Sequence, residues 1–190
     1  MMRELFVTTL YDAEIGDEAL LRALAHSIRM LAEDDQAGRR WSKEHRYAGY
    51  TSYASLNDLP KRDPAFAELA KQLSRHACEF ARDAFDLQQK PRLDSLWVNL
   101  LKAGGQHSGH IHPHSIISGT LYVEAPKGAG AIRFEDPRLP LMMSAPPRSD
   151  TFVRVDPYPG LLLMWESWLR HEVLTGSGRG ERLSISFNFA

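Results

Sequence analysis

The chain has 190 residues, of which 43 % are hydrophobic and 25 % charged, and its formal net charge is -1 at pH 7. These values are typical of a globular protein with a sizeable core, and they predict one domain over residues 1–190. A net charge this close to zero gives no electrostatic basis for binding nucleic acid or an anionic membrane.

The single cysteine, Cys78, excludes an internal disulfide and favours a reducing compartment. The N-terminal segment becomes acidic before a long apolar run can form, so no signal peptide is predicted. No stretch reaches the roughly 18 apolar residues of a membrane span. We therefore expect a cytoplasmic protein that does not bind membranes.

The N-terminal part, residues 1–91, is predicted to be mainly helical. Apolar residues at helical spacing predict one helix from Asp17, its N-cap, to Glu33. A second helix is predicted from Pro64 to Phe85, with proline at its first position. The other predicted segments are a short strand at Leu5–Tyr11, a polar loop at 34–46 and an irregular, weakly β segment at 47–59.

From residue 92 onward, short apolar or alternating segments are separated by Gly and Pro turns. The predicted strands are 95–101, 118–124, 131–135, 151–155, 161–165, 171–175 and 182–189. Many short strands at close spacing are typical of a jelly roll. Helices followed by strands predict an α+β, mainly β fold, in which helices of residues 1–91 pack against a jelly-roll core of residues 92–190.

Four of the eight histidines lie between His107 and His114. Residues two apart on an extended strand point to the same face, so His110 and His112 can present two imidazoles to one metal ion. His112 and His114 form a second pair of this kind. Because proline rarely lies within a paired central strand, Pro113 favours a strand that ends near His112, and hence the first pair.

The only histidine after this cluster is His171. A jelly roll brings strands that are distant in sequence together, so His171 can supply a third metal ligand. Arg182 and Ser184 lie two apart on the last predicted strand and share a face, where a guanidinium and a hydroxyl suit a carboxylate. The alternative for Arg182 is a surface position with a weak ion pair to Glu181.

The order of motifs in the C-terminal part resembles that of the 2-oxoglutarate–iron(II)-dependent oxygenases. The resemblance is specific from about Trp97 to the C-terminus. The matching segments are His110-Ile111-His112-Pro113, Ser118-Gly119-Thr120-Leu121-Tyr122, Phe134-Glu135-Asp136-Pro137-Arg138, Pro159-Gly160-Leu161-Leu162-Leu163, His171-Glu172-Val173 and Arg182-Leu183-Ser184-Ile185-Ser186-Phe187-Asn188.

This resemblance implies a double-stranded β-helix that holds one Fe(II) and uses 2-oxoglutarate as cosubstrate in a dioxygenase reaction, with hydroxylation of an unknown small molecule or peptide. It implies that His171 is the distal iron ligand, and that Arg182 and Ser184 bind the far carboxylate of 2-oxoglutarate. Asn99 and Tyr122, on flanking strands, are expected to line the cosubstrate pocket.

One departure from the oxygenase pattern leaves alternatives open. The superfamily uses two histidines and one carboxylate, with His-x-Asp or His-x-Glu where this chain has His-x-His. Three-histidine iron sites occur in the cupins, so a cupin-like dioxygenase that does not use 2-oxoglutarate is the second hypothesis. A non-catalytic jelly-roll binding module is the third. The Pro-rich segment 137–147 is interpreted either as an apolar lid or as the contact of a homodimer.

Overall fold

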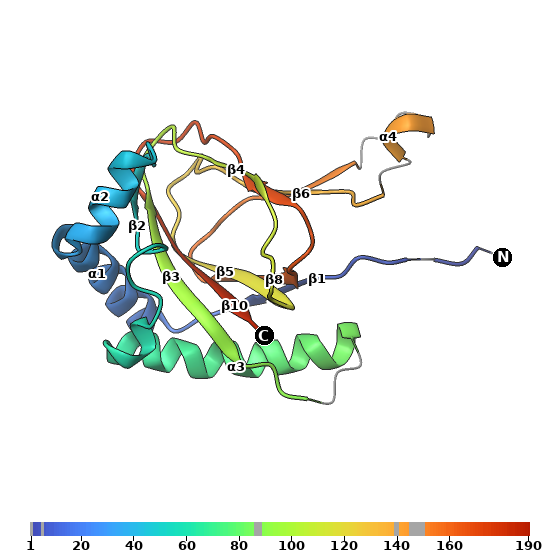
Figure 1. Ribbon diagram of the computed structural model, residues 1–190, viewed down its shortest axis with the longest axis horizontal. Coiled ribbons are helices and arrows are strands. Elements are labelled where there is room, and N and C mark those ends of the chain that lie inside the picture. The colour runs from blue at the N-terminus through green and yellow to red at the C-terminus, as the bar shows by residue number, and fades with distance from the viewer. Residues whose placement is uncertain (1, 5, 86–88, 139–140, 145–150) are drawn as a thin grey trace.

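The computed structural model describes residues 2–4, 6–85, 89–138, 141–144 and 151–190. In this part of the chain, a layer of helices covers one face of a six-stranded sheet, and a four-stranded sheet lies against the other face (Figure 1). Within each sheet, the neighbouring strands run antiparallel. The two sheets form the predicted jelly roll.

The six-stranded sheet has the order β1 (Leu10–Glu14), β8 (Leu161–Glu166), β5 (Ile117–Glu124), β10 (Arg182–Phe189), β3 (Leu93–Leu101) and β2 (Gly49–Thr51). The four-stranded sheet has the order β4 (His107–His110), β9 (His171–Val173), β6 (Ile132–Glu135) and β7 (Phe152–Val155). Strands from the two ends of the C-terminal part are therefore neighbours, as a jelly roll requires.

Strand β10, at the centre of the larger sheet, shows how alternation separates the two faces. Its apolar residues Leu183, Ile185, Phe187 and Phe189 are fully buried in the core between helices and sheet. The intervening residues are polar and begin with Arg182 and Ser184. Because successive side chains on a strand point to opposite faces, these polar groups face the space between the two sheets.

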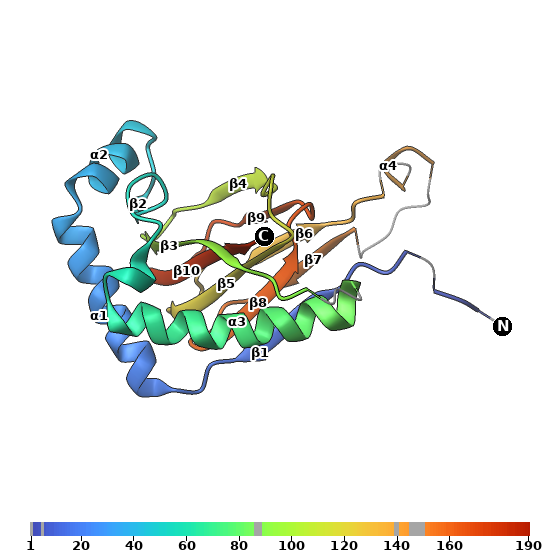
Figure 2. The same ribbon diagram turned by 60° about the horizontal axis from the view of Figure 1, so that its bottom comes forward.

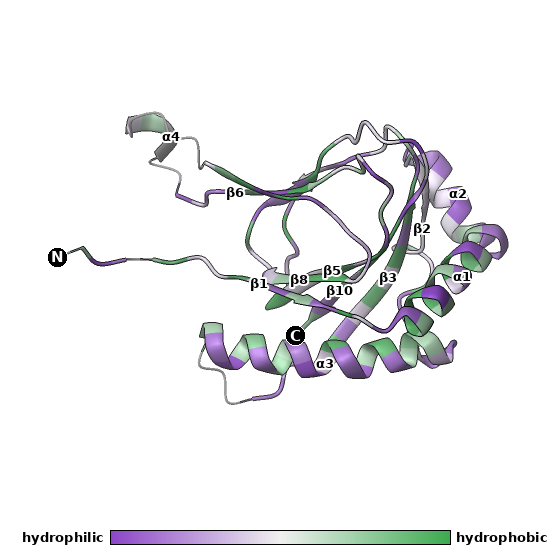
Figure 3. Cartoon of the chain, turned by 180° about the vertical axis from the view of Figure 1, so that it is seen from behind, coloured by the Kyte–Doolittle hydropathy of each residue, from purple (hydrophilic) through white to green (hydrophobic). Residues whose placement is uncertain are grey.

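The helical layer consists of α1 (Glu18–Asp34), α2 (Gln36–Glu44), the short 3-10 helix η1 (Leu59–Lys61) and α3 (Pro64–Phe85). Figure 2 shows α3 lying along the larger sheet. The buried apolar residues of α1 and α3 pack in one core with those of that sheet. Figure 3 shows hydrophobic and hydrophilic segments alternating along both helices. Asp17 caps α1 by accepting a hydrogen bond from the Leu20 amide at 3.0 Å, which confirms the predicted helix start.

Two predictions for the N-terminal part were wrong. The predicted strand Leu5–Tyr11 lies too early, because Phe6 and Val7 are 92 % and 65 % exposed and the strand that pairs with β8 is β1. The predicted loop 34–46 contains α2, which has no apolar stripe for sequence analysis to detect. Asp35 starts this helix by accepting a hydrogen bond from the Gly38 amide at 3.0 Å.

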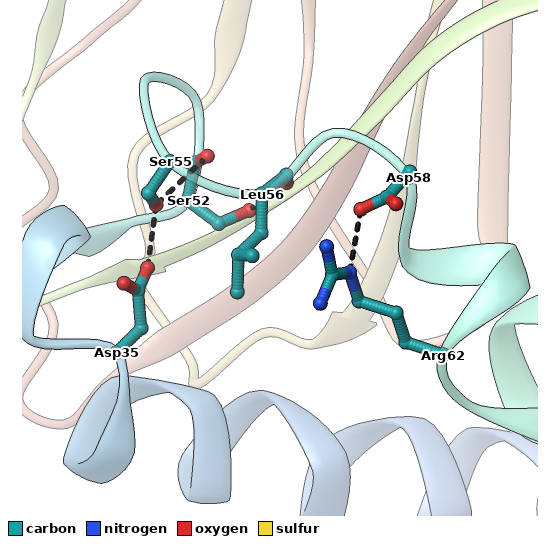
Figure 4. A network of polar contacts seen from close by, with 6 residues as sticks. All are labelled: Asp35, Ser52, Ser55, Leu56, Asp58 and Arg62. Atoms are coloured by element: carbon teal, nitrogen blue, oxygen red, sulfur yellow. Dashed lines mark hydrogen bonds and ion pairs between the residues drawn. The ribbon is translucent and has the colours of Figure 1, made fainter.

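The Asp35 carboxylate is also hydrogen-bonded to the loop that follows β2 (Figure 4). It accepts hydrogen bonds from Ser55 Oγ at 2.5 Å and Tyr50 Oη at 2.8 Å. Burial alone would raise the pKa of Asp35, but the hydrogen bonds from Gly38, Ser55 and Tyr50 outweigh it and hold the pKa below its usual value. One ionised side chain therefore links α2, β2 and this loop.

Part of the Pro-rich segment, residues 139–140 and 145–147, lies outside the described residues, so its predicted role as a lid or dimer contact stays a prediction. Between these stretches, the short helix α4 (Leu141–Ser144) is described. A search of the described helices finds none that is long and apolar enough to cross a membrane.

We predict that Asp35→Ala lowers the free energy of unfolding by about 2 kcal/mol, because a helix cap and two side-chain hydrogen bonds are lost. Urea unfolding measures this change. The control is Asp34→Ala, which removes an exposed neighbouring carboxylate and should change the stability by less than about 0.5 kcal/mol.

The pH dependence of the Asp35 contribution has a defined sign. A carboxyl group with a lowered pKa in the folded state adds stability above its unfolded-state pKa of about 3.9, and this stability is lost as the pH falls through the folded value. The stability difference between the wild type and Asp35→Ala should thus shrink below pH ~4. A constant difference down to pH ~2 would contradict the role given to the ionised carboxylate.

Candidate metal centre

Three histidines converge between the two sheets: His110 and His112 come from the end of β4 and the residues that follow it, and His171 comes from β9. One potential ligand atom from each of His110, His112 and His171 lies within 4.8 Å of the other two. His110, the last residue of β4, is the direct antiparallel partner of His171, the first residue of β9. The pairing of these two strands is what brings residues 61 positions apart into one cluster.

His112 reaches the cluster by a different route from the one predicted. Strand β4 ends at His110, so His112 does not share a strand face with it. Instead, the His112 amide donates a hydrogen bond to the Ser167 carbonyl at 3.0 Å, which fixes it against the turn between β8 and β9. His114 is exposed, has a positive φ of 71° and is not part of the cluster.

Hydrogen bonds set the tautomers of two of the three imidazoles. His110 Nδ1 lies 2.7 Å from the Ser108 carbonyl, and His171 Nδ1 lies 2.9 Å from the Leu169 carbonyl. A carbonyl oxygen can only accept, so each Nδ1 carries the proton and each Nε2 keeps a free lone pair. His171 Nε2 lies 3.3 Å from His112 Nε2. This is the arrangement in which outer hydrogen bonds orient imidazoles toward a metal ion.

Burial keeps the imidazoles of His112 and His171 neutral. Burial, with the neighbouring His110, lowers the pKa of His112 to about 4, although Asn188 acts in the opposite direction. Burial is also the main cause that lowers the pKa of His171 to about 3, against a hydrogen bond to Leu169 that raises it. Neutral imidazole is the form that binds metals, so neither ligand must lose a proton near pH 7.

Aromatic side chains surround the imidazoles and limit access of water. The ring of Trp97 is stacked near His112, with centroids 5.9 Å apart. The ring of Trp165 meets His171 edge-on at 4.6 Å, and Phe134 contacts the Trp165 ring in turn. Such an apolar surround strengthens the electrostatic interactions of a bound ion.

No Asp or Glu belongs to the histidine cluster among the described residues. Asp136, a carboxylate in the matching motif Phe134–Arg138, accepts hydrogen bonds from the guanidinium of Arg138 at 2.9 and 2.6 Å. The Asp136 carboxylate therefore pairs with a guanidinium two residues away and does not belong to the cluster. The ligand set available to a metal is three neutral imidazoles.

Arg182 lies on the same inner surface and is 4 % exposed. This excludes the alternative of a surface ion pair. Its Nη1 donates to the Gly130 carbonyl at 3.1 Å, and its guanidinium carbon lies 5.6 Å from the centroid of the Tyr122 ring. Its Nε is buried and has no hydrogen-bond partner within the described structure. A buried cation with an unsatisfied donor fits a carboxylate ligand.

The other predicted pocket residues lie beside Arg182. In the strand register, Ser184 is opposite both Asn99 and Tyr122. Asn99 donates to Ser186 Oγ at 3.1 Å and accepts from Thr51 Oγ1 at 2.9 Å, so its amide is oriented by neighbours. Burial raises the pKa of Tyr122 to about 12, which keeps the phenol protonated beside the guanidinium.

Two residues of this inner surface were missed by sequence analysis. Tyr47 Oη lies 2.8 Å from His107 Nε2 and 3.4 Å from Asn99 Oδ1. Burial, with Arg182 and His110 nearby, lowers the pKa of His107 to about 3. In the sequence, His107 belongs to the run of four histidines but has no predicted partner, and Tyr47 lies in the segment 47–59 that was predicted to be irregular and weakly β. Their contact joins residues 60 positions apart, for which neither segment carries a local signal.

Comparison with protein families finds that residues 95–188 match the model described as "Putative 2OG-Fe(II) oxygenase". No curated protein sequence gives a significant match. Solved structures with a similar fold include a Pseudomonas putida prolyl-4-hydroxylase, with 19 % identity over 96 % of this chain and 92 % of that chain, and a TM-score of 0.65.

Two further similar structures are those of HygX from Streptomyces hygroscopicus and of SnoN, an enzyme of nogalamycin biosynthesis. HygX with nickel and 2-oxoglutarate bound has 16 % identity over 96 % of this chain and 82 % of that chain, with a TM-score of 0.61. The non-heme alpha ketoglutarate dependent epimerase SnoN has 16 % identity over 96 % and 78 %, with a TM-score of 0.67. At such identities, these structures establish the jelly-roll fold.

We predict that the protein binds one Fe(II) or Co(II) ion per chain under anaerobic conditions, and that His171→Ala weakens this affinity by about 100-fold or more, because one of three ligands is lost. Competition against a chromophoric chelator measures the affinity. The control is His114→Ala, which should leave it unchanged because His114 is outside the cluster. An equal loss in both variants would contradict the ligand set.

Proposed function

We propose that this chain is an Fe(II)- and 2-oxoglutarate-dependent oxygenase that hydroxylates a C–H bond of a small molecule, a proposal supported by the match of residues 95–188 to the family model of putative 2OG-Fe(II) oxygenases. The observation that supports this most strongly is the joint presence of three convergent imidazoles and a buried arginine with an unsatisfied Nε. One group fits a divalent metal ion and the other fits a carboxylate of the cosubstrate.

His110, His112 and His171 would hold Fe(II), and Arg182 with Ser184 would hold the far carboxylate of 2-oxoglutarate. Once bound, this pair supplies the chemistry that activates dioxygen and oxidises a substrate C–H bond while 2-oxoglutarate is decarboxylated to succinate. The chain itself performs no redox step. Its residues bind, orient and exclude water.

The orientation of 2-oxoglutarate would depend on the fixed donors around Arg182. The Gly130 carbonyl holds Nη1 at 3.1 Å and so sets the direction of the guanidinium plane. The oriented Asn99 amide and the protonated Tyr122 phenol border the same space. A guanidinium whose orientation is already fixed binds a carboxylate with less loss of side-chain entropy than a mobile guanidinium does.

Because no carboxylate belongs to the histidine cluster among the described residues, a second candidate function must also be tested. Three neutral imidazoles leave the iron site one unit more positive than the usual two-histidine, one-carboxylate set. That ligand set is shared with cupin-like dioxygenases that do not use 2-oxoglutarate. The buried Arg182 supports the first proposal, because a cupin-like reaction gives no reason for a cation there.

We predict that 2-oxoglutarate added to the Fe(II)-loaded wild type without oxygen produces a weak visible charge-transfer band. Arg182→Ala should raise the concentration needed for half of this band by about 100-fold, because a charge-assisted, bidentate contact is lost. Arg182→Lys should have an intermediate effect. The iron content of both variants should be unchanged.

The matched control is Arg179→Ala, which removes an exposed arginine from the loop before β10. It should leave the titration as in the wild type. Iron bound without any band at saturating 2-oxoglutarate would overturn the proposed cosubstrate and support the cupin-like alternative. Circular dichroism of Arg182→Ala separates lost binding from lost folding.

A further inference from the structure

A groove of about 330 Å³ lies beside the histidine cluster, and apart from His112 its residues belong neither to that cluster nor to the predicted 2-oxoglutarate pocket. Its walls are the segment that follows β4, the turn after β8 and the end of α3. The residues that line it are Phe85, Ile111, His112, Pro113, His114, Ser115, Ile116, Glu166 and Trp168. His112 is the one residue that belongs both to this groove and to the histidine cluster.

The walls of the groove are mainly apolar and open to solvent. Ile111, Ile116 and Trp168 are 49 %, 42 % and 47 % exposed, although large apolar side chains are usually covered. Three such residues around one hollow form a contiguous apolar patch, which in soluble proteins marks a binding site. The volume of the groove is at the lower end of the range for small-molecule sites.

One carboxylate gives the groove its charge. Glu166 Oε2 accepts a hydrogen bond from Trp168 Nε1 at 2.6 Å, so the carboxylate and the indole are held together. Neither Lys nor Arg lines the groove, and no ion pair of Glu166 is found among the described residues. A carboxylate beside an exposed indole face is suited to bind an ammonium group, through charge attraction and cation–π contact.

The groove is preformed by backbone hydrogen bonds between its walls. The Ser167 amide donates to the Ile116 carbonyl at 3.1 Å, and the His112 amide donates to the Ser167 carbonyl at 3.0 Å. The Ile116 amide donates to the Phe189 carbonyl at 2.9 Å, which ties one wall to β10. The groove and the His112 imidazole are therefore positioned by the same contacts.

A second hollow beside the cluster offers a useful contrast. It has a volume of about 170 Å³ and borders His171. Its charges are already paired, because Arg133 contacts Glu172, and Arg170 lies 3.1 Å from Glu135. An added ion there would have to displace an existing partner. The groove at Glu166 requires no such displacement.

We propose that this groove binds the primary substrate, and that the substrate is a compact apolar amine whose ammonium group contacts the Glu166 carboxylate and the face of the Trp168 indole. This inference rests on the proposed oxygenase function, because His112 would place the apolar body of the substrate next to the iron. The Glu166 carboxylate selects the ammonium group, and Ile111 with Ile116 selects an apolar body.

The first experiment measures binding of 2-phenylethylammonium to the metal-free protein by calorimetry, with 2-phenylethanol as the uncharged probe of similar shape. The ammonium probe should bind at least about tenfold more tightly than the alcohol. Glu166→Gln should remove this preference, and Trp168→Leu should weaken both probes. Equal affinity of the two probes for the wild type would overturn the proposal.

The control variant is Glu14→Gln. Glu14 is an exposed glutamate opposite Leu161 at the other end of β8, far along the strand from Glu166. This variant should bind both probes as the wild type does. Loss of the ammonium preference in Glu14→Gln as well would assign the preference to overall charge and overturn the proposal.

The second experiment places the bound probe relative to the histidine cluster. Proton NMR signals of 2-phenylethylammonium should broaden with the Mn(II)-loaded protein and stay narrow with the Zn(II)-loaded protein. Probe binding without this broadening would overturn the groove as a substrate site. Failure of the wild type to bind any metal would instead overturn the proposed function, and the metal-free binding data distinguish that result from failure of the groove.

Discussion

The antiparallel pairing of β4 with β9 is the constraint on which the candidate site depends. It sets His110 opposite His171, and the turn that precedes β9 holds His112 through the Ser167 carbonyl. Both strands are short, with four and three residues, so their own hydrogen bonds stabilise them little. Their position comes from the larger sheet, whose buried strands β5, β8 and β10 supply the apolar area that stabilises the whole jelly roll. The site is thus formed by two short strands of the smaller sheet, and its stability depends on the core of the larger sheet.

One face of strand β10 contributes to the hydrophobic core, and the other carries polar residues of the candidate site. The face toward the helices is uninterrupted Leu, Ile and Phe, and it belongs to the main core. The face toward the smaller sheet begins with Arg182 and Ser184, which are buried despite being polar. Burial of an arginine with an unsatisfied donor is unfavourable in the absence of a partner. The alternation of β10 therefore buries the Arg182 guanidinium at an energetic cost, and a carboxylate ligand bound there would offset this cost.

The sequence predicted those elements whose signals are local. The alternation at 182–189 gave the full extent of β10, and a helical stripe with Asp63-Pro64 gave both ends of α3. The metal cluster was predicted in composition but for a partly wrong reason, since His112 is held by a loop contact and not by strand geometry. Helix α2 and the contact between Tyr47 and His107 were missed. Both depend on tertiary partners, and a polar nine-residue helix has no periodic apolar pattern to reveal it.

The charge of the site explains why a carboxylate should lie in the groove and not at the metal. With three neutral imidazoles, the ferrous dication and Arg182 together exceed the charge of a bound 2-oxoglutarate dianion by one unit. Within the described residues, the cluster itself holds no acidic group to balance this excess. A cationic substrate would be repelled from such a centre in a site shielded from water. Glu166, at the outer side of His112, would offset that repulsion where the substrate enters. The three-histidine ligand set and the groove carboxylate then form one arrangement. The negative charge that the usual ligand set places on the metal lies instead in the groove, where a cationic substrate would bind.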